Sequence, residues 1–193
     1  MGVDSSGETT DHYSPWYCLR TKKKTRKRDF KKIHVAMEIK GPEKPIYSIE
    51  VTKATRHDSP LLIPLLEQIN GEIGDVCGDK GLSSRRNAQY IAKRGGTPFL
   101  MMKKNSTRKS KGYPAWRKMH KSREKDEKAW DKRYHKRSNS EAGFSSFKQQ
   151  TNSYLSSRNR KCQTNEIWLK TIGYNIRQLI HRTIRLAVTR GEL

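Results

Sequence analysis

The stretch IGDVCGDKGLSSRRNAQYIAKRGGTPFLMM, residues 73–102, carries the clearest signal of the fold. Its apolar start, residues 73–79, predicts a short strand that runs into a glycine-bounded turn. Either serine of the pair at 83–84 can cap a helix that reaches Arg94, where two glycines stop it. Residues 98–102 are short and apolar, which predicts a second strand. A strand, a helix and a strand in this order are typical of α/β layer folds.

Two alternating apolar runs precede this stretch. Apolar residues alternate with other types over residues 33–39 and again over 47–51, on either side of Gly41-Pro42-Glu43-Lys44. This pattern predicts an antiparallel hairpin with one buried face. Asp58-Ser59-Pro60 then resembles a capped helix start, and apolar residues continue at helical spacing to Ile69. The predicted fold class is therefore α/β, with a mixed sheet flanked by helices.

The part of the chain after residue 102 is different in kind. Residues 103–137 hold 15 Lys and Arg against 4 acidic residues, which indicates an extended basic arm or an insertion with partial helix. Trp116 and Trp130 in this segment either stack on exposed bases or pack beneath the basic arm. Two helices are predicted after it, over residues 141–150 and 165–188. The apolar stripe of the second helix is expected to be core packing. That stripe comprises Leu169, Ile172, Ile176, Leu179, Ile180, Ile184 and Ala187.

The charge of the chain favours a polyanionic partner. Of its 193 residues, 42 are Lys or Arg and 19 are Asp or Glu, which gives a formal net charge of +23. Such an excess is neutralised well by nucleic acid, where bound Lys and Arg release condensed counterions. The run of residues 20–32, with nine Lys and Arg, is expected to contact the DNA backbone. A membrane partner is disfavoured because no apolar run of 18 residues exists.

Cysteine and histidine give no metal or disulfide signal. Cys18, Cys77 and Cys162 are far apart and form no C-x-x-C pair, and the six histidines lack metal-ligand spacing. We therefore expect neither a disulfide framework nor a zinc site, and a reducing cytoplasm suits the chain.

Three carboxylates stand out by their context. Asp4 is expected to leave a short strand into a small-residue turn, Asp79 follows another strand end, and Glu141 opens a helix. Strand ends converge at one edge of a sheet, so the three side chains can meet there. Clustered carboxylates repel one another unless a cation neutralises them, and hard oxygen ligands suit Mg²⁺ or Mn²⁺.

Each of these residues also has an ordinary structural interpretation. Asp79 alone is a common turn residue, and Ser138 with Glu141 forms the pattern of a capping box. Four other carboxylates compete for the site. Asp58 is expected to be a helix cap, Glu38 and Glu50 are expected to face solvent, and Asp75 has no assigned role.

Four spaced residues favour the catalytic interpretation of the three carboxylates over the structural one, because they resemble a known signature. Tyr134, Arg137, Glu141 and Lys148 match the Y-x2-R-x3-E-x6-K pattern of DDE transposases in the insertion-sequence-four group and its relatives. In a helix the four residues would share one face.

Further segments are similar to the same family. Asp-Ser-Ser-Gly at residues 4–7 and Gly-Asp-Lys-Gly at 78–81 look like its two aspartate motifs. Residues 52–59 and the C-terminal Gly173-Tyr174-Asn175 are also similar, so the resemblance covers nearly the whole chain in the right order.

The resemblance implies a single ribonuclease H-like catalytic domain over residues 1–193, with a basic insertion at 103–137. It implies two Mg²⁺ or Mn²⁺ ions held by Asp4, Asp79 and Glu141, which catalyse DNA cleavage and strand transfer. Tyr134, Arg137 and Lys148 would contact double-stranded DNA at element ends and target. The expected setting is a prokaryotic cytoplasm, in association with the nucleoid. The oligomeric state is left open, with a dimer on DNA as one candidate.

The sequence also departs from the family pattern. Only three residues precede Asp4, where the family has a helical DNA-binding region, so that region is expected to be absent and Met1-Gly2-Val3 to be a short remnant of the first strand. Glu8 and Leu82 stand where aromatic residues are usual. These features suggest a truncated copy of reduced stability. The alternative functions are a non-catalytic basic DNA-binding remnant and a related nuclease that cleaves without rejoining.

Overall fold

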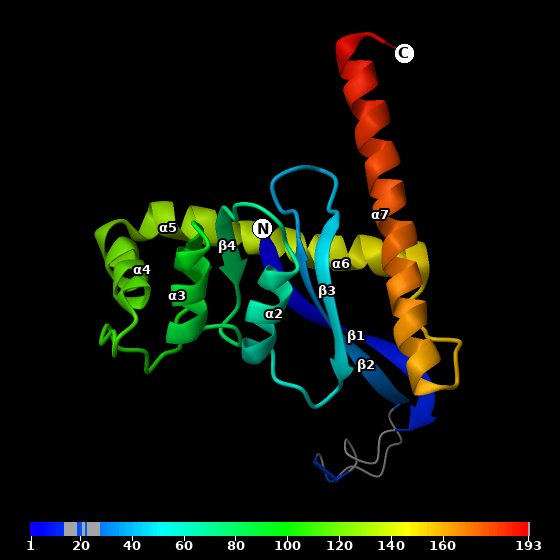
Figure 1. Cartoon of the computed structure of the whole chain (residues 1–193), viewed down its shortest axis with the longest axis horizontal. Coiled ribbons are helices and arrows are strands. Elements are labelled where there is room, and N and C mark those ends of the chain that lie inside the picture. Colours follow the sequence, from blue (N-terminus) through cyan, green and yellow to red (C-terminus); the bar gives the residue numbers. More distant parts are fainter. Residues whose placement is uncertain (14–18, 21, 23–27, 193) are drawn as a thin grey trace. The chain divides into compact units, whose positions relative to one another are not determined.

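The computed structural model describes residues 1–13, 19–20, 22 and 28–192 (Figure 1). Its strands are β1 (Gly2–Tyr13), β2 (Arg28–Met37), β3 (Ile46–Lys53), β4 (Asp75–Gly78) and β5 (Thr97–Leu100). Its helices are η1 (Ser59–Leu61), α2 (Leu62–Glu67), α3 (Arg85–Lys93), α4 (Pro114–Lys125), α5 (Glu127–Tyr134), η2 (His135–Arg137), α6 (Ser138–Thr151) and α7 (Arg160–Arg190). Cys18 and residues 21 and 23–27 of the predicted DNA-contact run at residues 20–32 lie outside the described residues.

The five strands form one sheet in the order β3-β2-β1-β4-β5. β4 pairs in parallel with both β1 and β5. β2 and β3 are neighbours joined by residues 38–45 alone, a connection too short for a parallel crossover, so the predicted antiparallel hairpin is confirmed. The sheet is therefore mixed, and the predicted α/β class is confirmed.

By residue contacts the chain divides into two compact units. The first comprises residues 1–4, 34–50 and 57–143. Its apolar core includes Leu62 and Leu66 of α2, Val76 of β4, Ile91 of α3 and Leu100 of β5, all of them fully buried. Within this unit, α3 contacts α4 and β5, and α5 contacts β4 and β5 (Figure 1).

The predicted start of α3 is confirmed in detail. Ser84 has an extended backbone, and its hydroxyl accepts a hydrogen bond from the Asn87 N–H, as an N-cap should. Asn87 is itself buried, and its amide donates to the carbonyl oxygen of Leu82, which ties the turn after β4 to the helix.

The basic segment after β5 is mostly helical in α4 and α5. Trp116 and Trp130 are 5% and 3% exposed, so they pack inside the first unit and the alternative that they stack on bases is wrong for this structure. The indole N–H of Trp116 donates to the Thr107 carbonyl oxygen at 2.8 Å. The cationic segment is thus anchored in the first unit by its two buried tryptophans.

The second unit comprises residues 5–33, 51–56 and 144–193. Its core includes Phe147 of α6 and Tyr174 of α7, whose rings meet edge to face at 5.4 Å. The side chain of Asn159 caps the start of α7, and Gly191, with φ of 72°, ends it in the left-handed conformation typical of a helix C-terminus.

Three expectations from the sequence are wrong. β1 does not end near Asp4 but continues to Tyr13, so residues 5–7 are strand and not a turn, and the expected three-residue remnant is a twelve-residue central strand. The hairpin is not buried on one face only, because residues 33–37 of β2 are all buried. The stripe on α7 is not core, because Leu169, Ile176 and Leu179 are 69%, 53% and 57% exposed.

None of the helices in the described part of the chain is long and apolar enough to cross a membrane.

Candidate active site

Asp4 and Asp79 lie side by side on neighbouring strands. β1 and β4 run parallel, and Val3 is the register partner of Gly78. Asp4 follows Val3 within β1, and Asp79 is the first residue after β4, so each aspartate comes directly after one member of this register pair. The structure therefore places the first two predicted carboxylates at corresponding positions of two neighbouring strands.

The turn after β4 holds Asp79 in place. Its Oδ1 accepts hydrogen bonds from the Gly81 N–H at 2.7 Å and the Leu82 N–H at 3.3 Å. A Cβ at position 81 would lie 3.0 Å from Asp79 Oδ1, so the glycine permits this close approach. Asp79 is thus a turn residue, as its ordinary interpretation predicts, and its second carboxylate oxygen is not used in these two bonds.

Glu141 is linked to Asp4 through Arg137. One guanidinium nitrogen of Arg137 lies 2.9 Å from Glu141 Oε1, and another lies 3.6 Å from Asp4 Oδ2. Arg137 is 23% exposed and Asp4 is 19% exposed, so this contact is screened less than an ordinary surface pair. A positive charge between two carboxylates relieves the repulsion that their approach would otherwise cause.

Glu141 lies in the first turn of α6, but the predicted capping box of Ser138 and Glu141 is wrong. Ser138 has helical backbone angles, and its hydroxyl donates to the His135 carbonyl oxygen at 2.8 Å. The chain enters α6 directly from the 3-10 turn η2. Because residues three apart eclipse in a 3-10 turn, Tyr134 and Arg137 come close together, and their side chains are hydrogen-bonded.

Tyr134 is a buried residue of the site. Its ring is 8% exposed and stacks on Trp130, with ring centroids 5.4 Å apart and an angle of 13° between the planes. Burial raises the pKa of the Tyr134 hydroxyl, and the neighbouring Arg137 opposes that rise. The negative charge of Asp79 raises this pKa further.

The fourth signature residue, Lys148, belongs to the second unit. There its positive charge helps to lower the pKa of Glu8, a fully buried carboxylate on β1. Burial is nonetheless the largest influence on Glu8 and raises its pKa overall. Lys170 Nζ lies 3.9 Å from Glu8 Oε2, and among the described residues neither oxygen of Glu8 has a hydrogen-bond donor.

Replacing Glu8 by glutamine is expected to stabilise the fold at neutral pH. A carboxyl whose folded-state pKa is raised destabilises the native state once it ionises, so the gain is present above the raised pKa. It disappears as the pH falls through that pKa towards the unfolded value near 4.5. Lys170 keeps the carbonyl oxygens of Asn152 and Tyr154 as acceptors. Urea unfolding of both proteins from pH 4 to pH 8 tests this, and a glutamine variant that is less stable at pH 8 would contradict it.

The rival carboxylates have structural roles. Asp58 lies 3.1 Å from the buried His34 Nδ1, and the expected side-chain cap is wrong because it makes no capping hydrogen bond to η1. Glu38 and Glu50 are half-buried and do not simply face solvent. Burial alone would raise the pKa of Glu38, but hydrogen bonds from the Tyr47 hydroxyl and two backbone N–H groups lower it. Asp75 lies 3.9 Å from Arg133.

Cys77, two residues before Asp79, carries a thiol that is unreactive. Burial raises the pKa of its thiol to about 11, and its Sγ donates to the Arg133 carbonyl oxygen at 3.4 Å. Since the thiolate is the reactive form of cysteine, a thiol of this pKa is protonated and unreactive at neutral pH.

The sequence matches a known family over most of its length. A family model described as the transposase DDE domain matches residues 3–176. The chain belongs to this family. No curated protein and no solved structure matches the chain. Membership implies transposase function and a DNA substrate for this domain.

Among the described residues, no group of three or more His, Cys, Asp or Glu side chains is arranged to hold a metal ion. Arg137, which the sequence assigned to DNA contact, forms ion pairs with both Asp4 and Glu141 in this structure. The offset of four residues from Arg137 to Glu141 on a helix is the signal that could have predicted this ion pair.

Proposed function

We propose that this chain is the catalytic domain of a DDE transposase of the insertion-sequence-four group, which cleaves DNA and joins the freed 3′-hydroxyl end to target DNA. In this proposal residues 1–193 form one ribonuclease H-like domain. Asp4, Asp79 and Glu141 are its catalytic carboxylates, and Tyr134, Arg137 and Lys148 contact DNA at the element ends and the target.

The observation that carries the proposal is the register of β1 and β4. Asp4 and Asp79 each directly follow one member of the Val3–Gly78 register pair on parallel neighbouring strands, which supports a shared site for the two carboxylates. Glu141 is connected to Asp4 by the guanidinium of Arg137.

The three carboxylates fit hard divalent cations by their chemistry, because Mg²⁺ and Mn²⁺ prefer carboxylate oxygens. Asp4 and Glu141 already share one cationic group, so their oxygens lie on two sides of a common position. When bound, two such ions would activate the attacking oxygen and stabilise the leaving oxygen of an in-line displacement.

Arg137 is the residue whose position must change in this proposal. Its guanidinium neutralises the carboxylates in the described structure, and a metal ion would take over that role. The guanidinium can then form a bidentate pair of hydrogen bonds with a DNA phosphate. Tyr134, held by its stack on Trp130, limits how far Arg137 can move because the two side chains are hydrogen-bonded.

A joining assay tests the proposed function. The purified chain is incubated with Mn²⁺, supercoiled plasmid and a labelled duplex that ends in a free 3′-hydroxyl. Transfer of label to plasmid supports a transposase, and a matched duplex with a 3′-deoxy end should give none. Nicking without transfer would identify a nuclease, and DNA binding with neither reaction would identify a non-catalytic binder.

A further inference from the structure

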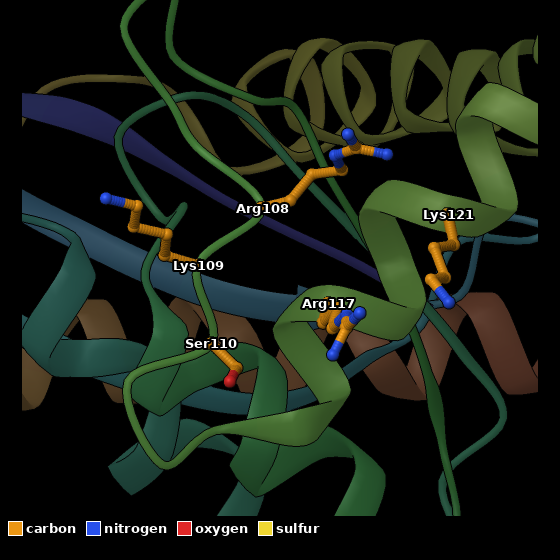
Figure 2. Close-up of a pocket in the computed structure, with 5 residues that line it drawn as sticks. All are labelled: Arg108, Lys109, Ser110, Arg117 and Lys121. Carbon is orange, nitrogen blue, oxygen red and sulfur yellow. The ribbon is translucent and has the colours of Figure 1, made fainter.

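A second cationic site, formed by other residues than the three carboxylates, lies beside α4. A cavity of about 410 Å³ is lined by Arg108, Lys109, Ser110, Arg117 and Lys121. Figure 2 shows that these side chains come from two segments, the loop before α4 and α4 itself. Four of the five lining side chains are cations, and like charges held this close repel unless an anion lies between them.

The loop that carries half of this pocket is fixed on both sides. The Trp116 indole donates to the Thr107 carbonyl oxygen at 2.8 Å, and the Arg85 Nε donates to the Lys109 carbonyl oxygen at 2.8 Å. The Arg85 guanidinium also lies over the Trp116 ring, 5.5 Å from its centroid. Arg108 therefore lies between two anchored backbone positions, and the pocket needs little ordering to bind an anion.

The other half of the pocket is set by helix geometry. Arg117 and Lys121 are four residues apart in α4, so they lie on one face of the helix, one above the other. On the other face of α4, the buried residues Ala115, Trp116 and Met119 pack inside the first unit. The two cations are thus presented to solvent from a rigid element.

The local electrostatic field is positive. The neighbouring His120 is buried, and burial is the main cause that lowers its pKa; Arg108, Arg85 and Arg123 lower it further, against the opposing effect of Glu124. Glu124 is the acidic side chain at the rim, and its Oε2 lies 3.0 Å from Arg108. Arg108 and Glu124 are both more than half exposed, so a phosphate can compete for Arg108 at little cost.

We propose that this pocket binds the phosphate backbone of duplex DNA as a contact separate from the catalytic carboxylates. The proposal rests on the proposed function, because it takes DNA as the partner. An open pocket with exposed Lys and Arg side chains suits a continuous polyanion, whose phosphates position a protein without reading the bases. Arg117 and Lys121 would each take a phosphate, and Arg108 would exchange Glu124 for another.

The test measures binding of a 20-base-pair duplex without divalent metal, at several salt concentrations. The double variant Arg117→Gln/Lys121→Gln is compared with Lys125→Gln/Lys128→Gln, which removes the same charge from exposed positions outside the pocket. Each lost phosphate contact lowers the salt slope of log K by about 0.9, so the pocket variant should lose about 2 units and bind roughly tenfold more weakly. The control should change the slope by much less.

A third variant is expected to strengthen DNA binding instead of weakening it. Glu124→Gln releases Arg108 from its ion pair, so it should tighten DNA binding and steepen the salt slope by up to about one unit. Equal slope losses in the pocket and control variants, or no tightening with Glu124→Gln, would overturn the pocket proposal. If these failures occur while the unchanged chain still joins DNA ends, the proposed function stands and only the pocket is wrong. If the unchanged chain binds no duplex, both fail.

Discussion

Replacing Asp79 by asparagine is expected to lower the rate of Mn²⁺-dependent nicking of supercoiled DNA by about 10³-fold, because a carboxylate that holds a catalytic cation contributes several kcal/mol of transition-state stabilisation. The substitution suits the site, since the asparagine Oδ1 can still accept from Gly81 and Leu82. The turn after β4 should therefore persist, and the loss should come from the missing charge.

Asp75→Asn is the matched control for this prediction. Asp75 lies on β4, the strand that leads to Asp79, and its carboxylate lies 3.9 Å from Arg133, outside the proposed site. Its variant should nick DNA at close to the unchanged rate. Mn²⁺ should raise the melting temperature of the unchanged chain and of Asp75→Asn, and much less that of Asp79→Asn. Equal nicking by both variants would show that Asp79 has no part in the reaction.

The sequence predicted the second aspartate better than the first. Asp79 follows an apolar strand and lies in a turn bounded by Gly78 and Gly81, and the structure places it directly after that strand. Asp4 was expected at a strand end because Ser5, Ser6 and Gly7 have low strand propensity. In the structure β1 is the central strand with partners on both sides, and ladder hydrogen bonds outweigh local propensity there.

The connection of Glu141 to Asp4 could be predicted only in part. The spacing of Tyr134, Arg137 and Glu141 placed them on one helical face, but it did not reveal that η2 interrupts the helix. Nor could spacing show that Arg137 pairs with a residue 133 positions earlier. That contact depends on where the sheet places β1, which no local pattern encodes.

The C-terminal helix shows why periodicity alone can mislead. The α7 stripe that the sequence assigned to the core has the right helical spacing, yet its residues are largely exposed. The face that packs contains Gln163, Ile167, Thr171, Tyr174 and Gln178. Three of these five are polar, so a count of apolar residues selects the wrong face. A hydrophobic period identifies a helix but does not identify which side is covered.

Two isoleucines of this helix should therefore respond very differently to the same change. Ile167→Ala removes a side chain that is 0% exposed and is expected to lower the free energy of unfolding by about 2–5 kcal/mol, as buried truncations do. Ile176→Ala removes one that is 53% exposed and should change stability by less than about 0.5 kcal/mol, because alanine also has the higher helix propensity. Urea unfolding of both variants at equal protein concentration measures the difference. Similar losses in the two variants would show that the stripe containing Ile176 is covered in solution, whereas a large loss for Ile167 alone would confirm that α7 packs through its partly polar face.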